Sequence, residues 1–325
     1  MRKKLIAFMV GIAALNPVAW SDESNPFALK YKKNKPRSYF WMPLATFFVP
    51  GLDQIIEGQW GYGGFYAGMS FSSLAYTSYN AQKLADEREE MGYDNLPDYE
   101  QRNRDTHGER ERKIGYGSQL SNAMGGLSTY HAFRTAVRSR QPMGEFAFLT
   151  KEETPAELAL APFQFSHLTK LTTWIPLAVG VSIAALQVSS VDETDGYKKD
   201  AFSSSDAFYT AGTSYNAGVW EEAMFRGWLM PTLRETWGSN FWSNTATATV
   251  FGLLHLGPQN PIPVAQLGLG WYLGFVAQKR EWTLSESIFI HAWWDVIALA
   301  AAYQMRETKK VDDVVLWLPQ LQFAW

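Results

Sequence analysis

Two adjacent carboxylates, Glu221 and Glu222, lie in an apolar stretch of the sequence. Acidic groups in such surroundings cost free energy unless they are paired or have a function. Glu222 and Arg226 are four residues apart, so on a helix they share one face and can form an ion pair. Glu221 then points about 100° away and is left to contact a group on another helix. A structural ion pair with a spare acid accounts for this segment equally well.

Two of the five histidines occur in similar apolar stretches. His255 ends the run that contains Phe251, whereas His291 precedes Asp295 by one helical turn on the same face. A lone histidine in an apolar run is usually a core residue with satisfied hydrogen bonds, and a His–Asp pair can serve packing alone. The occurrence of all these patterns on neighbouring segments favours one shared site, to which Glu221 also belongs.

Apolar segments rich in small and aromatic residues are predicted to form the helices that position this site. No strand-type alternation is long enough to build a sheet. We therefore expect an all-α fold, a polytopic transmembrane helix bundle. The predicted helices are 61–79, 114–133, 171–188, 207–233, 240–256, 264–278 and 285–303.

The chain is predicted to begin with a signal peptide at residues 1–21. Basic residues after Met1 precede an apolar segment, and the small residues Ala19 and Ser21 suit cleavage by a signal peptidase. The apolar segment is too short for a comfortable transmembrane helix. An uncleaved N-terminal anchor is the alternative interpretation.

Three regions are expected to follow the signal peptide. Residues 22–168 form an N-terminal membrane-associated region, within which the charged segment 80–113 is predicted to be a solvent-exposed loop. Residues 169–305 form a second membrane region that holds the candidate site, and 306–325 form a C-terminal tail.

The composition excludes several classes of protein. With 29 Lys and Arg against 32 Asp and Glu, the net charge is −3, so no broad electropositive surface exists for nucleic acid. Aromatic residues make up 15 % and charged residues only 19 %, which excludes a disordered chain. The absence of cysteine excludes thiol nucleophiles, thiolate zinc sites and disulfides.

The ordered motifs E-E-x-x-x-R at Glu221, F-x-x-x-H at Phe251 and H-x-x-x-D at His291 resemble those of a known family. This is the family of CAAX prenyl proteases and bacteriocin-processing enzymes, which are intramembrane glutamic or metallo endopeptidases. The resemblance covers roughly residues 171–303, and the first half of the chain has no counterpart in it. Asp295 departs from the Asn of eukaryotic members; an ionised Asp cannot donate a hydrogen bond, so we expect it to orient His291.

The resemblance implies hydrolysis of a peptide bond by a glutamate-activated water. Glu221 would be the general base, and His255 would help to hold the water. His291 would stabilise the oxyanion of the tetrahedral intermediate. Glu222 and Arg226 would fix the helix and the orientation of Glu221.

A metal-dependent mechanism is the alternative for the same residues. Glu221, His255 and His291 could hold zinc with one coordination position open. We expect no cofactor, because the sequence contains no H-E-x-x-H motif.

Two other functions compete with an endopeptidase. One is a catalytically silent membrane scaffold or immunity-type protein with the same fold, which the intact Glu221, His255 and His291 disfavour. The other is a small-molecule transporter, for which we find no internal repeat of broken helices. The expected location is the bacterial inner membrane, crossed several times. The expected partners are the lipid bilayer and a peptide or membrane-protein substrate, without nucleic acid.

Overall fold

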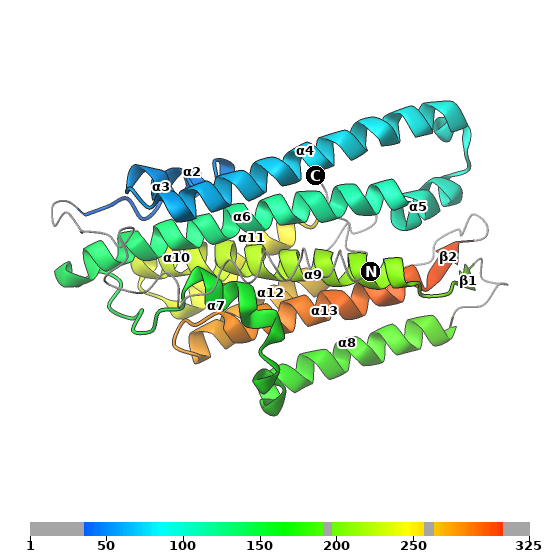
Figure 1. Cartoon of the computed structure of the whole chain (residues 1–325). Coiled ribbons are helices and arrows are strands. Elements are labelled where there is room, and N and C mark those ends of the chain that lie inside the picture. The colour runs from blue at the N-terminus through cyan, green and yellow to red at the C-terminus, as the bar shows by residue number, and fades with distance from the viewer. Residues whose placement is uncertain (1–35, 191–196, 257–262, 308–325) are drawn as a thin grey trace.

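The computed structural model describes residues 36–190, 197–256 and 263–307, and most of them are helical (Figure 1). The all-α class is therefore confirmed for this part of the chain. Two short strands, β1 (Tyr197–Lys199) and β2 (Met305–Glu307), form an antiparallel ribbon. The α-helices are α2 (Trp41–Phe48), α3 (Leu52–Ile56), α4 (Trp60–Met91), α5 (Asp98–His107), α6 (Glu109–Arg140), α7 (Pro155–Leu160), α8 (Leu171–Ser190), α9 (Ser204–Met224), α10 (Met230–Trp237), α11 (Asn240–Leu253), α12 (Val264–Lys279) and α13 (Ser285–Tyr303).

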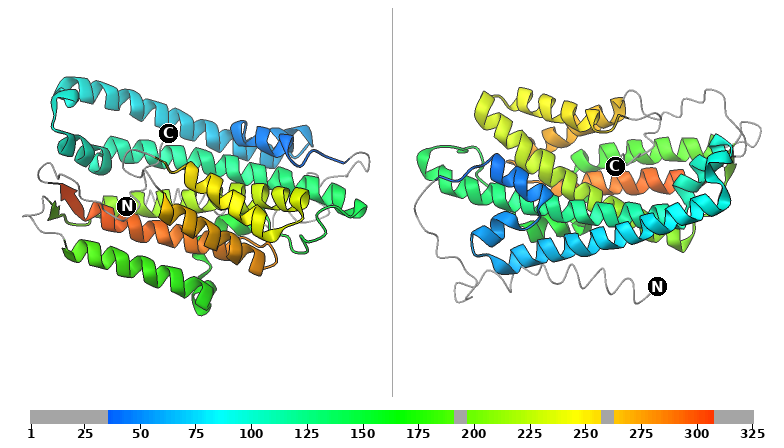
Figure 2. Two further views of the ribbon diagram at one scale, coloured as in Figure 1. Left: turned by 180° about the vertical axis from the view of Figure 1, so that it is seen from behind. Right: turned by 90° about the horizontal axis from the view of Figure 1, so that it is seen from above.

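Five long helices lie side by side in the order α4, α6, α9, α13 and α8 (Figure 1). A π-helical segment, Phe225–Leu229, joins α9 directly to α10. The pair α11 and α12 packs on α10, the π-helical segment and α13, and it faces the viewer in the left view of Figure 2. Helix α9 is thus enclosed between α6 and α13, in the middle of the bundle.

One hydrophobic core joins the N-terminal half of the chain to the half that carries the candidate site. It includes Tyr66 of α4, Leu127 of α6, Val219 of α9 and Ile288 of α13, each with at most 1 % of its surface exposed. Burial of this kind stabilises the fold by roughly 1.5–3 kcal/mol for each large apolar side chain. The first half therefore forms part of the wall that holds α9 in place.

The charged segment 80–113 is largely helical, which corrects the expectation of a loop. Helix α4 continues into this segment as far as Met91, and Gly92, in a left-handed conformation with φ of 64°, follows its last turn. Arg88 Nη2 lies 2.6 Å from Asp105 Oδ1 and 3.2 Å from Glu111 Oε1, so charges on α4, α5 and α6 pair with one another. Mixed charges that pair between and along helices support helical structure. A run of mixed charges is equally typical of a solvated loop, so the sequence pattern alone does not distinguish a loop from paired helices.

One described helix, α8, is long and apolar enough to cross a membrane, with 20 residues and a mean hydropathy of 1.7. The several spans expected from the sequence are not confirmed by this measure. The long helices α4, α6 and α9 carry polar and charged residues, while α11 and α12 have only 14 and 16 residues. The predicted signal peptide, 1–21, and residues 308–325 of the predicted tail lie outside the described residues.

Candidate active site

The six candidate residues lie where α9, α11 and α13 meet. All except the half-buried His255 are buried, with at most 4 % of their surface exposed. Helices α9 and α13 approach closely here because Gly218 has no side chain: a Cβ at this position would lie 2.9 Å from Ala292 N. The residues are Glu221 and Glu222 at the end of α9, Arg226 in the π-helical segment, His255 just after α11, and His291 and Asp295 on α13.

Glu222 and Arg226 form the ion pair that their spacing predicts. Arg226 Nη1 donates to Glu222 Oε1 at 2.7 Å, and Arg226 Nη2 donates to the carbonyl of Gly270 on α12, also at 2.7 Å. The guanidinium lies 4.6 Å from the centre of the Phe251 ring. A buried charge pair costs desolvation energy that is recovered only through contacts of this kind, so loss of one partner is strongly destabilising.

Glu222 also holds His291. The Nδ1 atom of His291 donates to Glu222 Oε1 at 2.9 Å, so its Nε2 atom faces the remaining acids. Nε2 lies 3.6 Å from Glu221 Oε2 and 3.7 Å from Asp295 Oδ2. The orientation of the ring is thus set by Glu222 and not by Asp295, for which this role was expected.

His255, just after the end of α11, lies near Glu221 of α9. Its Nδ1 atom donates to the carbonyl of Phe251 at 2.7 Å, and its Nε2 atom lies 4.0 Å from Glu221 Oε2. The ring of Phe251 contacts both histidines, with centroid distances of 4.6 Å to His255 and 5.8 Å to His291. The main chain and the ring of Phe251 therefore position the two imidazoles on either side of Glu221.

Glu221 lies between the two histidines without a direct hydrogen bond to either. The distances of 3.6 Å and 4.0 Å exceed hydrogen-bond length but are short enough for a bridging water. Glu221 Oε2 is buried and accepts no hydrogen bond from the described residues. Buried polar atoms are normally satisfied by protein or by water, so this oxygen is available to a water or a substrate group.

A metal centre needs at least three donors at coordinating distance. Within residues 36–190, 197–256 and 263–307, no group of three or more His, Asp or Glu side chains has an arrangement suited to a metal ion. The donor set considered for zinc, Glu221, His255 and His291, is therefore not preformed as a coordination shell in this conformation.

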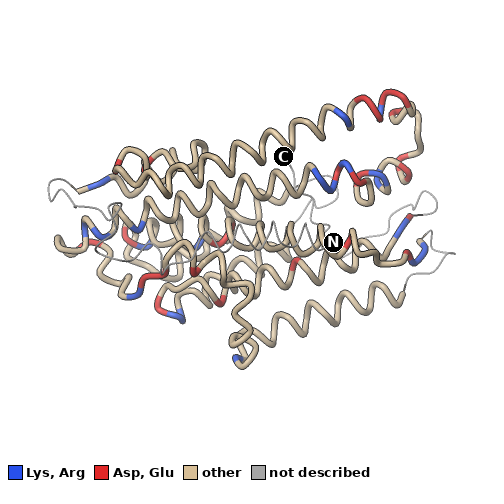
Figure 3. The backbone as a smooth tube through the Cα atoms, viewed as in Figure 1, with Lys and Arg blue, Asp and Glu red and all other residues tan. Residues whose placement is uncertain are grey.

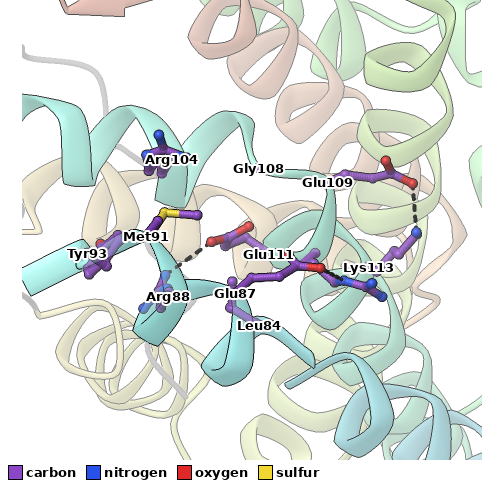
Figure 4. A pocket seen from close by; sticks show the side chains of 11 residues that line it. Leu84, Glu87, Arg88, Met91, Tyr93, Arg104, Gly108, Glu109, Glu111 and Lys113 are labelled. Atoms are coloured by element: carbon purple, nitrogen blue, oxygen red, sulfur yellow. Dashed lines mark hydrogen bonds and ion pairs between the residues drawn. The ribbon is translucent and has the colours of Figure 1, made fainter. Parts of the chain in front are cut away.

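The pocket in Figure 4 lies away from this site, between the end of α4, α5 and the start of α6. Its volume is about 250 Å³, and none of the candidate residues lines it. Lys113 pairs there with Glu109 at 2.6 Å, and Arg110 pairs with Glu87 at 2.9 Å. These four lining charges therefore pair with one another.

Sequence reasoning missed two features of the site. The carbonyl of Gly270 accepts a second hydrogen bond from Arg226, and a Cβ on Gly270 would lie 3.1 Å from Arg226 Nη2. The π-helical segment that carries Arg226 has no signature in the predicted helix 207–233. Such segments occur frequently at functional sites, but they show only in the backbone.

Comparison with known proteins supports the resemblance drawn from the motifs. Residues 203–297 match a family model described as type II CAAX prenyl endopeptidase Rce1-like. The match runs from the start of α9 into α13 and includes all six candidate residues. No curated protein and no solved structure matches the chain. The three motifs and the family model thus agree that residues 203–297 are similar to the type II CAAX prenyl endopeptidase Rce1-like family.

Proposed function

We propose that the protein is an intramembrane endopeptidase that hydrolyses peptide bonds with a water activated by Glu221. The observation that carries this proposal is the placement of Glu221 Oε2, buried and without a hydrogen bond from the described residues, 3.6 Å from His291 Nε2 and 4.0 Å from His255 Nε2. The matching family is one of endopeptidases, which supports a peptidase. A water bound between these atoms would have a base on one side and hydrogen-bonding imidazoles on the others.

In the first step Glu221 removes a proton from the water while the water oxygen bonds to the carbonyl carbon. The C=O electron pair moves onto the carbonyl oxygen and forms an oxyanion. In the second step the C=O bond re-forms and the C–N bond breaks. The departing amine takes the proton from Glu221, which regenerates the carboxylate.

His291 is proposed to stabilise the oxyanion. With Nδ1 held by Glu222, a protonated Nε2 can donate to the developing negative charge. Arg226 keeps the Glu222 carboxylate charged and fixed in position. His255 accepts from the water through Nε2, because its Nδ1 atom already donates to Phe251 O.

The membrane location is proposed from the surface of the bundle. Figure 3 shows Lys, Arg, Asp and Glu gathered mainly toward the ends of the long helices, and α8 uncharged along most of its length. With 32 residues each, α4 and α6 are about 48 Å long, enough to cross a bilayer core of about 30 Å. Exposed apolar side chains on several helices support lipid contact, among them Phe71, Leu74, Trp174, Ile175, Leu186, Val250, Leu253, Val264 and Phe275.

We propose that this membrane is the bacterial inner membrane, crossed several times, and that the substrate is a peptide or membrane protein. The lipid bilayer is then the second partner. A silent scaffold with the same fold is the competing proposal, and activity alone separates the two.

The experiment that tests the function is cleavage of a peptide library by purified protein in detergent. Wild type is compared with Glu221→Gln, and Glu90→Gln, which changes an exposed acid at the end of α4, is the matched control. Wild type and Glu90→Gln should cut the same peptides, whereas Glu221→Gln should cut none. Equal cleavage by wild type and Glu221→Gln, or no cleavage by wild type, would contradict the endopeptidase proposal and leave the scaffold.

A further inference from the structure

Gln266, in the first turns of α12, is buried with 5 % of its surface exposed. Neither Oε1 nor Nε2 of its side chain has a hydrogen-bond partner in the structure described. Buried amides are almost always paired, because an unpaired one loses its hydrogen bonds to water without compensation. An unpaired buried amide beside a binding site is suited to form hydrogen bonds with a bound ligand.

The pairing of α12 with α11 places the turn that carries Gln266 beside the end of α11, which His255 follows. The helices run antiparallel: at one end Gln278 Nε2 donates to Asn240 O at 2.8 Å. At the other end Leu267 packs on Gly252, where a Cβ would lie 2.5 Å from Leu267 Cδ2. The N-terminal turns of α12 therefore lie beside the C-terminal end of α11.

The same face of α12 contacts the buried ion pair. Gly270 follows Gln266 by one helical turn, and its carbonyl accepts from Arg226 Nη2 at 2.7 Å. A Cβ on Gly270 would lie 2.9 Å from Cδ1 of Phe251, whose ring packs against His255. Gln266 thus stands on the site-facing side of α12, at the level where α11 ends.

We propose that Gln266 binds the main chain of the substrate beside the scissile bond. Its Oε1 accepts from a peptide N–H, and its Nε2 donates to a peptide C=O. A primary amide offers one acceptor group and one donor group, which matches the N–H and C=O that one residue of an extended main chain presents on the same side. This inference rests on the proposed endopeptidase function and deepens it.

The proposal also defines the form of the substrate. The N–H and C=O groups of a helical segment already bond to each other, so they cannot pair with Gln266. An unwound, extended segment has these groups unpaired, and in a dry site it needs partners for them. The substrate class is therefore a peptide, or a stretch of a membrane protein, that is extended at the cleavage point.

The test uses a peptide that the wild type cleaves in the library, together with ester analogues. In each analogue one backbone N–H near the scissile bond is replaced by an ester oxygen. For wild type, one analogue should lose about tenfold in kcat/KM, the size of one hydrogen bond made in the transition state. In Gln266→Leu the normal peptide should be cut about tenfold more slowly, and that analogue should show no further loss.

Gln187→Leu is the matched control, since Gln187 Oε1 in α8 is also unpaired but lies on another helix. It should keep the wild-type sensitivity to every analogue. Gln266→Leu should keep or raise the thermal midpoint, because it removes an unpaired buried amide. Gln266→Met is used in the same way if the leucine variant does not fold.

Equal sensitivity of wild type and Gln266→Leu to all analogues would overturn the role of Gln266 while leaving the endopeptidase intact. A lowered thermal midpoint with unchanged sensitivity would show that Gln266 serves packing only. If the wild type cleaves no peptide, the endopeptidase proposal fails, and the substrate-binding role fails with it.

Discussion

His291 Nδ1 lies 2.9 Å from the same oxygen of Glu222 that accepts from Arg226 Nη1 at 2.7 Å. One carboxylate oxygen therefore connects a fully buried guanidinium to the imidazole that faces Glu221. The two adjacent acids have separate surroundings, since Glu222 is held by charged partners while Glu221 faces the histidines. The first prediction tests whether Glu221 and Glu222 have these separate roles.

Glu221→Gln should abolish cleavage and leave the fold unchanged. Loss of a general base typically lowers kcat by about 10²–10⁴-fold, and the amide keeps the size of the side chain. Glu222→Gln should lower both activity and stability, by about 3–5 kcal/mol, because Arg226 loses its charged partner. Thermal unfolding in detergent and a peptide assay measure the two effects. An equal loss of thermal stability in Glu221→Gln and Glu222→Gln would contradict the separate roles of the two acids.

Gly270→Ala should disrupt the site from α12. The added Cβ would lie 2.9 Å from Phe251 Cδ1 and 3.1 Å from Arg226 Nη2, so we expect a loss of about 1–3 kcal/mol and of activity. Gly268→Ala is the control on the same helix, because nothing lies within 4 Å of its Cβ position. The control should be neutral, or stabilising by up to about 1 kcal/mol. Similar thermal midpoints for both variants would argue against close packing at Gly270.

The helices of the site could be predicted from sequence because their apolar lengths and polar borders are local properties. The predicted helix 285–303 coincides with α13, and 264–278 differs from α12 by one residue. The pairing of Glu222 with Arg226 also follows from local spacing. These features need no knowledge of how distant segments meet.

The contact that holds His291 could not be predicted in this way. Residues four apart on one helix suggested Asp295 as its partner, but tertiary packing brings Glu222 closer, 69 positions away in sequence. The helical form of the charged segment 80–113 was missed for the same reason, since its ion pairs join different helices. Sequence spacing describes one helix at a time, and both features depend on pairs of helices.

Asp295→Asn should be mild. Asp295 Oδ2 is 3.7 Å from His291 Nε2, beyond hydrogen-bond length, and the ring is held by Glu222. We therefore expect less than a tenfold loss of kcat/KM, which corresponds to about 1.4 kcal/mol. A loss comparable to that of Glu221→Gln would mean that the charge of Asp295 orients His291 during catalysis.

Chelation separates the metal-free mechanism from the zinc alternative. With Glu221 acting on water directly, cleavage should be unaffected by prolonged treatment with a chelator. Zinc coordinated by Glu221, His255 and His291 would make the chelated protein inactive, and added zinc would restore the activity. The metal content of the purified protein, measured in parallel, controls for incomplete removal.

The bundle should cross the membrane, with α5 and the α12–α13 connection on opposite sides. Helix α13 starts at that connection and ends beside β2, which bonds to α5 through Asn103 and Glu307. Its 19 residues span about 28 Å, close to the thickness of a bilayer core.

Because the chain has no cysteine, Glu90→Cys and Lys279→Cys each introduce one unique labelling site. An impermeant thiol reagent applied to intact spheroplasts should label one of these variants, and inverted vesicles should label the other. Labelling of both from one side, or release of the protein by an alkaline wash, would mean that the bundle lies on the membrane surface.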